Sequence, residues 1–320
     1  MLLKRFAAGV LACATLAMVA ATAQRMFIIT LLRNDPPSDW PWIKARHPRL
    51  RAAALYLAGR ASSCSAVQAL GSVSAAKNLL DEAERIRRDM RLQRTEGAYS
   101  LWDTPQGEYW FPADSELRYL AVMLAEQALD NYRGVQPGDV VLDCGANVGA
   151  FTRTALKRGS RLVVAIEPGP ENVECLRRTF AGEIAAWRVI VKPVGVWDSN
   201  GMLRLGVVPT ISMGDSFVLH GGSGPAIPVT TVDALVRELE LHSADFIKMD
   251  IEGSEKNALR GAAESLRRFK PRMAISGYHL PEDPFAIPRL VLSLNPAYAV
   301  GFGYCKEFHN ELRPEVIEFR

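Results

Sequence analysis

The sequence predicts an α/β fold built on a parallel sheet, and two observations support this prediction. After Gly134, short apolar runs alternate with helix-like segments, which is the pattern of βαβ units. The first run passes directly into glycines and a helix, as happens at the ligand-binding edge of such sheets. The runs are VVLDC (140–144), LVVAIE (162–167), WRVIV (187–191), FIKMDI (246–251) and MAISGY (273–278).

The composition fits one large core with an accessory region. A chain of 320 residues, 48% of them hydrophobic, can bury such a core. The net charge of +3 is small and scattered, which argues against a dedicated nucleic-acid surface. The five cysteines are odd in number, far apart and without a C-x-x-C motif. We therefore expect neither a disulfide framework nor a zinc site, and a reducing compartment.

Residues 1–34 form a hydrophobic N-terminal segment in which the charged start MLLKRF precedes an apolar run. Three interpretations stay open: a membrane anchor within residues 6–32, a cleaved signal peptide, or a peripheral amphipathic segment. More basic residues follow the run than precede it, so an anchor would leave the main domain in the cytoplasm. We expect a membrane-associated protein with a cytoplasmic main domain, and a soluble cytoplasmic protein is the alternative.

The next two segments connect this start to the sheet. Residues 35–72 are predicted to form a basic, proline-containing linker, because DPPSDWPW disfavours a helix. Residues 73–134 are predicted to form a helical and hairpin accessory region. An amphipathic helix is expected over residues 73–94, and two aromatic-rich runs around Thr-Pro-Gln-Gly predict a hairpin. A further helix is expected from about Asp114 to Gly134.

The corner after the first run, DCGANVG, is predicted to hold a ligand, because ligands bind at the carboxyl ends of parallel strands. Gly145 and Gly149 leave room for a ligand to approach the backbone, and the following helix points its N–H groups there. The glycine spacing departs from the G-x-G-x-x-G pattern of dinucleotide sites. Asp143 would repel a diphosphate, whereas it suits a ligand with an amino group and a sulfonium charge.

The second run ends in Glu167, which is well placed to accept hydrogen bonds from both hydroxyls of a ribose. A nucleoside ligand is therefore expected. The alternative role for Glu167 is that of a strand-end residue that caps the next helix.

Three stretches resemble a known family. VVLDCGANVGAFT and VVAIEPGPEN resemble the first two cofactor motifs of class I S-adenosylmethionine-dependent methyltransferases. DFIKMDIEGSEKNALRGA, residues 245–262, resembles more narrowly the signature of the FkbM-family methyltransferases. The resemblance implies a Rossmann-like, seven-stranded sheet with helices on both faces over residues 135–320. AYAVGFGY and EVIEFR suit the antiparallel hairpin that closes such a sheet.

The resemblance also implies S-adenosylmethionine as the cofactor and a set of site residues. Asp250 would face the transferred methyl group, and Asp250 and His279 are the candidate bases. His279 suits this role if its pKa is unperturbed; its alternative role is a structural hydrogen bond. No dedicated metal site is expected. The cofactor-binding residues would be Asp143, Gly145, Asn147, Gly149, Glu167, Pro168 and, near the adenine unless it only forms an Asx-turn, Asp198.

The function predicted from this resemblance is O-methylation of a saccharide, glycolipid or secondary metabolite, with a small molecule or glycan as the acceptor. Two alternatives stay open. One is a non-catalytic, cofactor-binding scaffold at the membrane. The other is a nicotinamide-dependent oxidoreductase, which the missing third glycine disfavours.

Overall fold

The computed structural model describes residues 48–206, 216–218 and 224–320. The expected N-terminal segment and the first part of the expected linker lie outside these residues. The chain divides into two compact units. One comprises the described residues up to Ser74 together with Tyr304–Arg313, and the other comprises Ala75–Gly303 and Pro314–Arg320.

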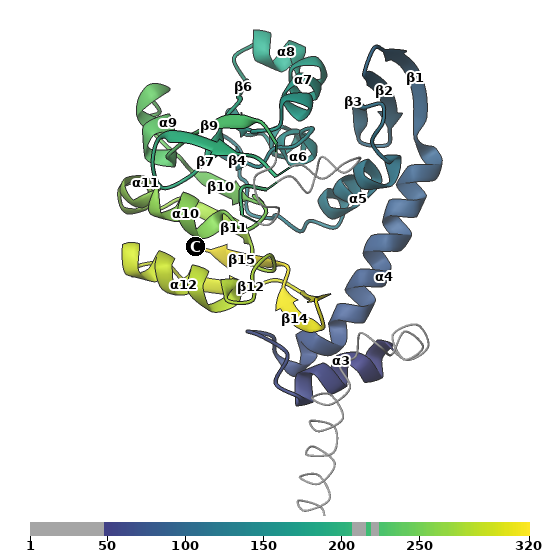
Figure 1. The fold of residues 1–320 in the computed structure, drawn as a ribbon, viewed down its shortest axis with the longest axis vertical. Coiled ribbons are helices and arrows are strands. Elements are labelled where there is room, and N and C mark those ends of the chain that lie inside the picture. The colour runs from purple at the N-terminus through teal and green to yellow at the C-terminus, as the bar shows by residue number, and fades with distance from the viewer. Residues whose placement is uncertain (1–47, 207–215, 219–223) are drawn as a thin grey trace, which may run out of the picture. The chain divides into compact units, whose positions relative to one another are not determined.

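The larger unit contains a seven-stranded sheet with the order β12-β15-β11-β10-β4-β5-β6, which confirms the predicted fold class (Figure 1). β15 is antiparallel to both of its neighbours, and the other pairs are parallel. The strands are β4 (Val140–Cys144), β5 (Leu162–Ile166), β6 (Val189–Lys192), β10 (Phe246–Met249), β11 (Arg272–Ser276), β12 (Val300–Phe302) and β15 (Val316–Phe319).

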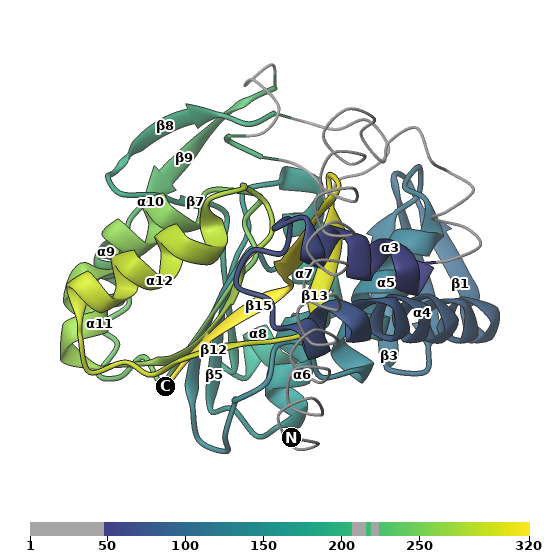
Figure 2. The same ribbon diagram turned by 90° about the horizontal axis from the view of Figure 1, so that it is seen from below.

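Helices cover both faces of this sheet, as Figures 1 and 2 show. Successive residues of a strand point to opposite faces, so Leu142 and Ile247 belong to one apolar cluster and Val141 and Phe246 to another. The first cluster packs against α9 (Val232–Glu238), α10 (Glu255–Arg260), α11 (Ala263–Arg268) and α12 (Asp283–Leu294). The second packs against α6 (Ala150–Lys157), α7 (Pro170–Thr179) and α8 (Ala181–Ala185).

The accessory region has the expected helix, hairpin and helix. The strands β2 (Tyr99–Thr104) and β3 (Gly107–Pro112) pair around the predicted turn, and β1 (Arg91–Glu96) adds a third strand. Apolar side chains of α4 (Ala66–Asp89) and α5 (Leu117–Ala128) share one cluster with this sheet. α4 begins and ends earlier than predicted, since residues 91–94 of the expected helix lie in β1, and α5 ends earlier, before the loop that carries Tyr132.

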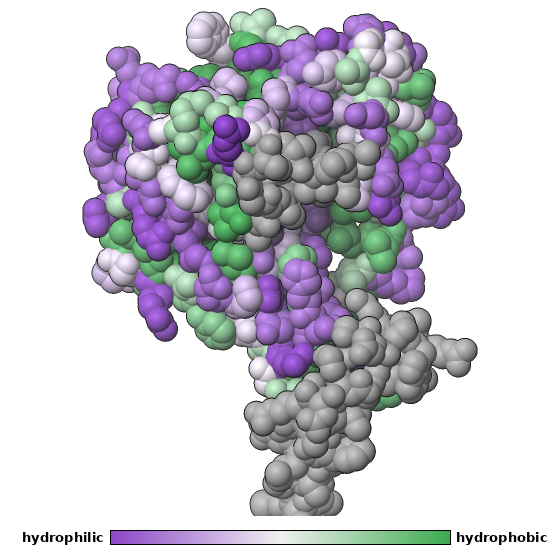
Figure 3. Space-filling view, in the orientation of Figure 1, coloured by the Kyte–Doolittle hydropathy of each residue, from purple (hydrophilic) through white to green (hydrophobic). Residues whose placement is uncertain are grey.

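A small sheet lies between β6 and β10 in the chain. It has the order β7-β9-β8 and consists of β7 (Gly195–Val196), β8 (Gly201–Arg204) and β9 (Ala226–Thr230). On the face shown in Figure 3, hydrophobic residues are scattered among hydrophilic ones. Over the described ranges, none of the helices combines the length and the apolar character that a membrane span requires.

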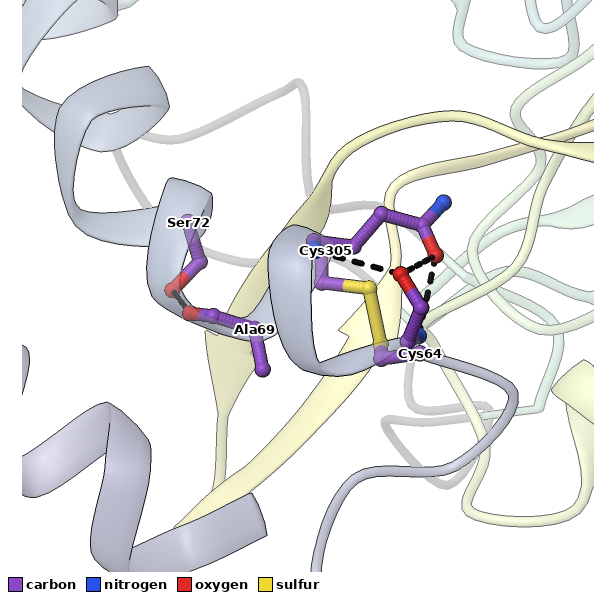
Figure 4. The surroundings of a disulfide bond; sticks show 6 residues. Cys64, Ala69, Ser72 and Cys305 are labelled. Atoms are coloured by element: carbon purple, nitrogen blue, oxygen red, sulfur yellow. Dashed lines mark hydrogen bonds between the residues drawn. A yellow bond between two sulfur atoms is a disulfide. The ribbon is translucent and has the colours of Figure 1, made fainter.

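The smaller unit corrects two expectations. Part of the expected linker is helical and forms α3 (Pro48–Leu57). Proline is favourable at the first position of a helix, and burial of Ala52 and Leu55 stabilises this one. The hairpin of β13 (Cys305–Phe308) and β14 (Glu311–Pro314) belongs to the same unit, except for Pro314. There Cys305 forms a disulfide with Cys64 (Figure 4). The prediction that the cysteines form no disulfide is therefore wrong, because spacing along the chain does not reveal a contact between residues 241 positions apart.

Candidate functional site

An open cleft lies at the carboxyl ends of the central strands of the large sheet. Residues 145–147 line it after β4, Glu167 and Pro168 after β5, and residues 250–252 after β10. Three of the predicted segments thus meet in one place, because parallel strands end at a common edge.

The glycines of the corner allow close packing within the protein. Gly145 has a φ of +76°, and a Cβ there would lie 2.0 Å from the Asp250 backbone oxygen. Gly149 has a φ of +93°, and a Cβ there would lie 2.2 Å from the Phe180 ring. Gly145 lines the cleft, but Gly149 does not. Phe180 and Leu176 fill the space beside Gly149, so packing explains why this position lacks a side chain, and its role in cofactor binding stays a prediction.

Asp143 lies beneath the corner and outside the lining of the cleft, contrary to expectation. Its side chain is fully buried, accepts a 2.6 Å hydrogen bond from Thr152 Oγ1, and lies 3.5 Å from Lys248 Nζ. Lys248 Nζ also donates to the Gly145 carbonyl oxygen at 2.7 Å. Burial raises the pKa of Asp143, and the Lys248 ammonium opposes this shift. Asp143 therefore supports the loop indirectly, by holding the lysine that binds its backbone.

Lys248 was not predicted as a site residue from the sequence. Burial disfavours its charge, but the Asp143 and Asp250 carboxylates outweigh this effect and raise the pKa of Lys248. The ammonium group is therefore charged at neutral pH. The available signal was a lysine inside the otherwise apolar run FIKM, where an unpaired charge is not tolerated.

Glu167 is buried at the floor of the cleft and joins the two loops around it. One carboxylate oxygen accepts a hydrogen bond from Asn147 N at 2.9 Å, and the other accepts one from Gly169 N at 2.9 Å. Asn172 Nδ2 donates a weaker bond at 3.3 Å. Burial raises the pKa of Glu167 despite these donors. Asn147 and Pro168 also line the cleft.

Asp198 lies apart from the other predicted residues. Its side chain is exposed, accepts a 3.0 Å hydrogen bond from Ser199 Oγ, and does not line the cleft. On this side the described lining consists of residues 194–196 and Phe217. The position of Asp198 near the adenine therefore stays a prediction, made for an exposed residue outside the described lining.

Asp250 follows β10 and is fixed by two hydroxyl groups. Tyr132 donates to Oδ2 at 3.0 Å and Ser276 donates to Oδ1 at 2.8 Å. Burial disfavours the charge of Asp250, but Lys248 and then His279 outweigh it and lower the pKa of the carboxyl. Asp250 is therefore ionised and rigidly held at the wall of the cleft. Neither hydroxyl group was predicted as a partner of Asp250 from the sequence, because Tyr132 and Ser276 lie far from Asp250 in the chain and only the fold brings them together.

His279 lies behind this wall, with its side chain 2% exposed. Nδ1 is 3.1 Å from Glu255 Oε1, and Nε2 is 3.5 Å from Asp250 Oδ1 and 3.4 Å from Glu252 Oε2. Burial opposes a charge on the ring, but Glu255 and Glu252 raise the pKa of His279 well above its usual range. The expectation of an unperturbed pKa is therefore wrong. Without another cation the ring is protonated near neutral pH, so it cannot accept a proton.

Comparison with known proteins identifies a family for this chain. A family model described as the methyltransferase FkbM domain matches residues 143–313. The hexuronic acid methyltransferase AglP of Haloferax volcanii is 28% identical over 153 residues, which are 48% of this chain and 61% of that protein. The match thus spans less than two thirds of the relative's length.

Solved structures include similar chains. A methyltransferase FkbM from Methylobacillus flagellatus KT is 19% identical, with a TM-score of 0.44, and the match covers 83% of this chain and 65% of that one. An O-methyltransferase from Bacillus cereus in complex with SAH is 13% identical, with a TM-score of 0.35, over 65% of this chain and 82% of that one. Similarities at this level carry no information on activity.

Proposed function

Because the chain belongs to the FkbM family of methyltransferases, we propose that it transfers a methyl group from S-adenosylmethionine, the cofactor of that family, to a hydroxyl group of a saccharide, glycolipid or secondary metabolite. The main support is that Glu167 and Asp250, from the ends of two different strands, line the same cleft. A nucleoside held at Glu167 and an acceptor held at Asp250 would meet inside it.

The lining of the cleft fits the cofactor. The Glu167 carboxylate can accept a hydrogen bond from a ribose hydroxyl at Oε2, which has one backbone donor, whereas Oε1 already accepts from Gly169 N and Asn172 Nδ2. Val194, Val196 and Phe217 offer apolar surface suited to an adenine ring. The Asp250 carboxylate would attract the positively charged sulfonium end. The cofactor supplies an activated methyl group, and these residues bind and orient it.

The acceptor end of the cleft needs to align a hydroxyl oxygen with the methyl group. Asp250 can accept a hydrogen bond from that hydroxyl, and its own position is fixed by Tyr132 and Ser276. Methyl transfer is an in-line displacement, so holding the two reactants in line supplies much of the rate enhancement. Because Asp250 has a lowered pKa, we assign it to orientation of the acceptor.

Among the acceptor classes, a saccharide is the one we favour. The curated relative AglP is named a hexuronic acid methyltransferase, and the match to it covers 48% of this chain. A glycolipid or a secondary metabolite would present the same chemical group, a hydroxyl oxygen. The acceptor is therefore best identified by direct assay.

The test uses the full chain in two steps. Calorimetric titration with S-adenosylhomocysteine measures cofactor binding, and tritium-labelled S-adenosylmethionine then reports methyl transfer to hexuronic acid glycosides and to matched neutral hexosides. We expect Glu167→Gln and Glu167→Ala to weaken binding by about 10- to 100-fold, the value of a hydrogen bond to a charged group. We expect label in the saccharide, at an O-methyl group identified by NMR.

Glu171→Ala is the matched control, because Glu171 is an exposed glutamate in the first turn of α7 and does not line the cleft. It should bind S-adenosylhomocysteine like the wild type. A folded chain that binds no S-adenosylhomocysteine would refute the proposal. A chain that binds it but methylates none of the acceptor classes would favour the non-catalytic scaffold.

A further inference from the structure

Three metal-ligating groups meet behind the acceptor end of the cleft. One atom each from Asp250, Glu252 and His279 lies within 4.8 Å of the others. Among the described residues, these three side chains form the one group of at least three possible metal ligands. No metal site was predicted from the sequence, because the ligands come from two strand ends and form no recognisable motif.

His279 gives the strongest indication of a ligand. Its Nε2 is buried and has no hydrogen-bond partner among the described residues, although it faces the Asp250 and Glu252 carboxylates at 3.5 and 3.4 Å. A buried nitrogen in this position costs free energy unless something bonds to it. Two carboxylates facing one imidazole nitrogen attract a cation, either a proton or a metal ion.

The other ring nitrogen favours the metal ion. Nδ1 lies 3.1 Å from Glu255 Oε1, and Glu255 is fully buried. When Nδ1–H donates to a carboxylate and a metal ion displaces the proton from Nε2, that nitrogen presents its lone pair to the ion, and a carboxylate behind a histidine is the usual support of a metal ligand. Asp250 has comparable support, because Tyr132 and Ser276 each donate to one of its oxygens.

We propose that Asp250, Glu252 and His279 bind a divalent cation of the Mn²⁺ or Mg²⁺ class. Two carboxylates and one imidazole form a mainly oxygen donor set, which suits these cations. Ligands about 2.1 Å from such an ion lie about 3 Å apart, so the distances of 3.5 and 3.4 Å from His279 Nε2 to the two carboxylates require only a small contraction, and all three ligand atoms already lie within 4.8 Å of one another. The side chains of Asp250 and Glu252 are each 23% exposed, which leaves the cation accessible from the cleft.

The role of the cation rests on the proposed function. A cation beside the acceptor hydroxyl withdraws electron density from its oxygen and favours loss of its proton to solvent. That oxygen then attacks the methyl carbon, so that an O–CH₃ bond forms while the S–CH₃ bond breaks. The electron pair of the broken bond stays on sulfur, and the sulfonium becomes the neutral thioether of S-adenosylhomocysteine.

The test is direct metal binding to the full chain after treatment with a chelator. Mn²⁺ is titrated and followed by electron paramagnetic resonance, and pulsed measurements detect a directly bound nitrogen. We expect a single Mn²⁺ per chain with nitrogen coupling. Glu252→Gln and His279→Gln should weaken binding by about 10- to 100-fold, and His279→Gln should also abolish the coupling.

Glu126→Gln is the matched control, because Glu126 lines the same cleft outside the triad. It should bind Mn²⁺ as the wild type does, and circular dichroism checks that every variant is folded. The same samples are titrated with S-adenosylhomocysteine. Cofactor binding without Mn²⁺ binding at millimolar concentrations, or Mn²⁺ binding unchanged in Glu252→Gln and His279→Gln, would overturn the metal site and leave the proposed function standing. Mn²⁺ binding by the triad without cofactor binding would support the site and refute the function.

Discussion

Lys248 connects the two ends of the cleft at the scale of single residues. Its ammonium group donates to the Gly145 carbonyl in the cofactor corner and lies 3.5 Å from Asp143. Its charge also lowers the pKa of Asp250 at the acceptor end. One buried cation therefore shapes a loop and holds a carboxylate ionised.

We expect Lys248→Met to lower the free energy of unfolding by about 3–5 kcal/mol, because it leaves the Asp143 carboxylate buried without its partner. Urea denaturation followed by tryptophan fluorescence measures the change. The double variant Asp143→Asn with Lys248→Met should lose less stability than Lys248→Met alone, since it removes both charges.

Lys77→Met is the control for loss of a lysine, because Lys77 pairs with Asp81 on the exposed surface of α4. Such a pair contributes about 1 kcal/mol or less. Equal effects of Lys77→Met and Lys248→Met would show that the buried pair has no special role.

Because the pKa of Glu167 is raised, we expect cofactor binding to depend on pH. Burial raises its pKa, so it takes up a proton at a higher pH than an exposed glutamate, whose pKa is about 4.3. The protonated carboxyl loses acceptor capacity toward ribose hydroxyls. We therefore expect affinity for S-adenosylhomocysteine to fall as the pH is lowered through this raised pKa, and to recover as the pH rises.

Calorimetric titrations over a series of pH values measure this dependence. Glu167→Gln should bind more weakly at neutral pH and should lose the acid-side decrease, because its amide does not titrate there. A decrease of the same size in Glu167→Gln would assign the titration to another group.

At the scale of elements, the hairpin β13–β14 is an insertion between β12 and β15. These two are the last strands of the large sheet in chain order. The hairpin belongs to the smaller unit, where the Arg51 guanidinium pairs with Glu307 at 2.7 Å and Cys64 bonds to Cys305. The disulfide therefore links the chain before α4 to the hairpin. A disulfide is typical of oxidising compartments, which runs against the reducing compartment expected from cysteine spacing.

We expect removal of this disulfide to destabilise the smaller unit by about 2–5 kcal/mol. Thermal unfolding with and without dithiothreitol provides the measurement. The reductant should lower the stability of the wild type and leave Cys64→Ser unchanged. Cys175→Ser is the control, because Cys175 is a free, buried cysteine of the larger unit, and this variant should respond to the reductant as the wild type does.

At the scale of the whole molecule, the order of strands decides where the site lies. β4 lies between β5 and β10, so the segments after these three strands converge on one cleft. Membrane association through residues 6–32 and a cytoplasmic position of the main domain stay predictions, since those residues lie outside the described part of the chain. A cytoplasmic position would give the site access to the cofactor, which is made inside cells.

Much of the fold and part of the site followed from local patterns. The alternation of apolar runs and helical segments indicated the sheet, and strand-end residues such as Glu167 and Asp250 were found because their position in a βα unit is visible in the chain. Asp143 and Gly149 occupy the same motif, yet they face the interior. The sequence alone could not separate these two pairs, because side-chain direction at a corner depends on the packing around it.

The sequence by itself determined the family, the parallel sheet and the strand ends that carry the site, because these depend on short-range periodicity and contiguous motifs. The tertiary structure decided what depends on contacts between distant segments. It paired Cys64 with Cys305, placed Lys248 under the cofactor corner, and surrounded His279 with carboxylates that change its pKa. Such partners lie far apart in the chain, so only folding brings their charges and bonding atoms within reach.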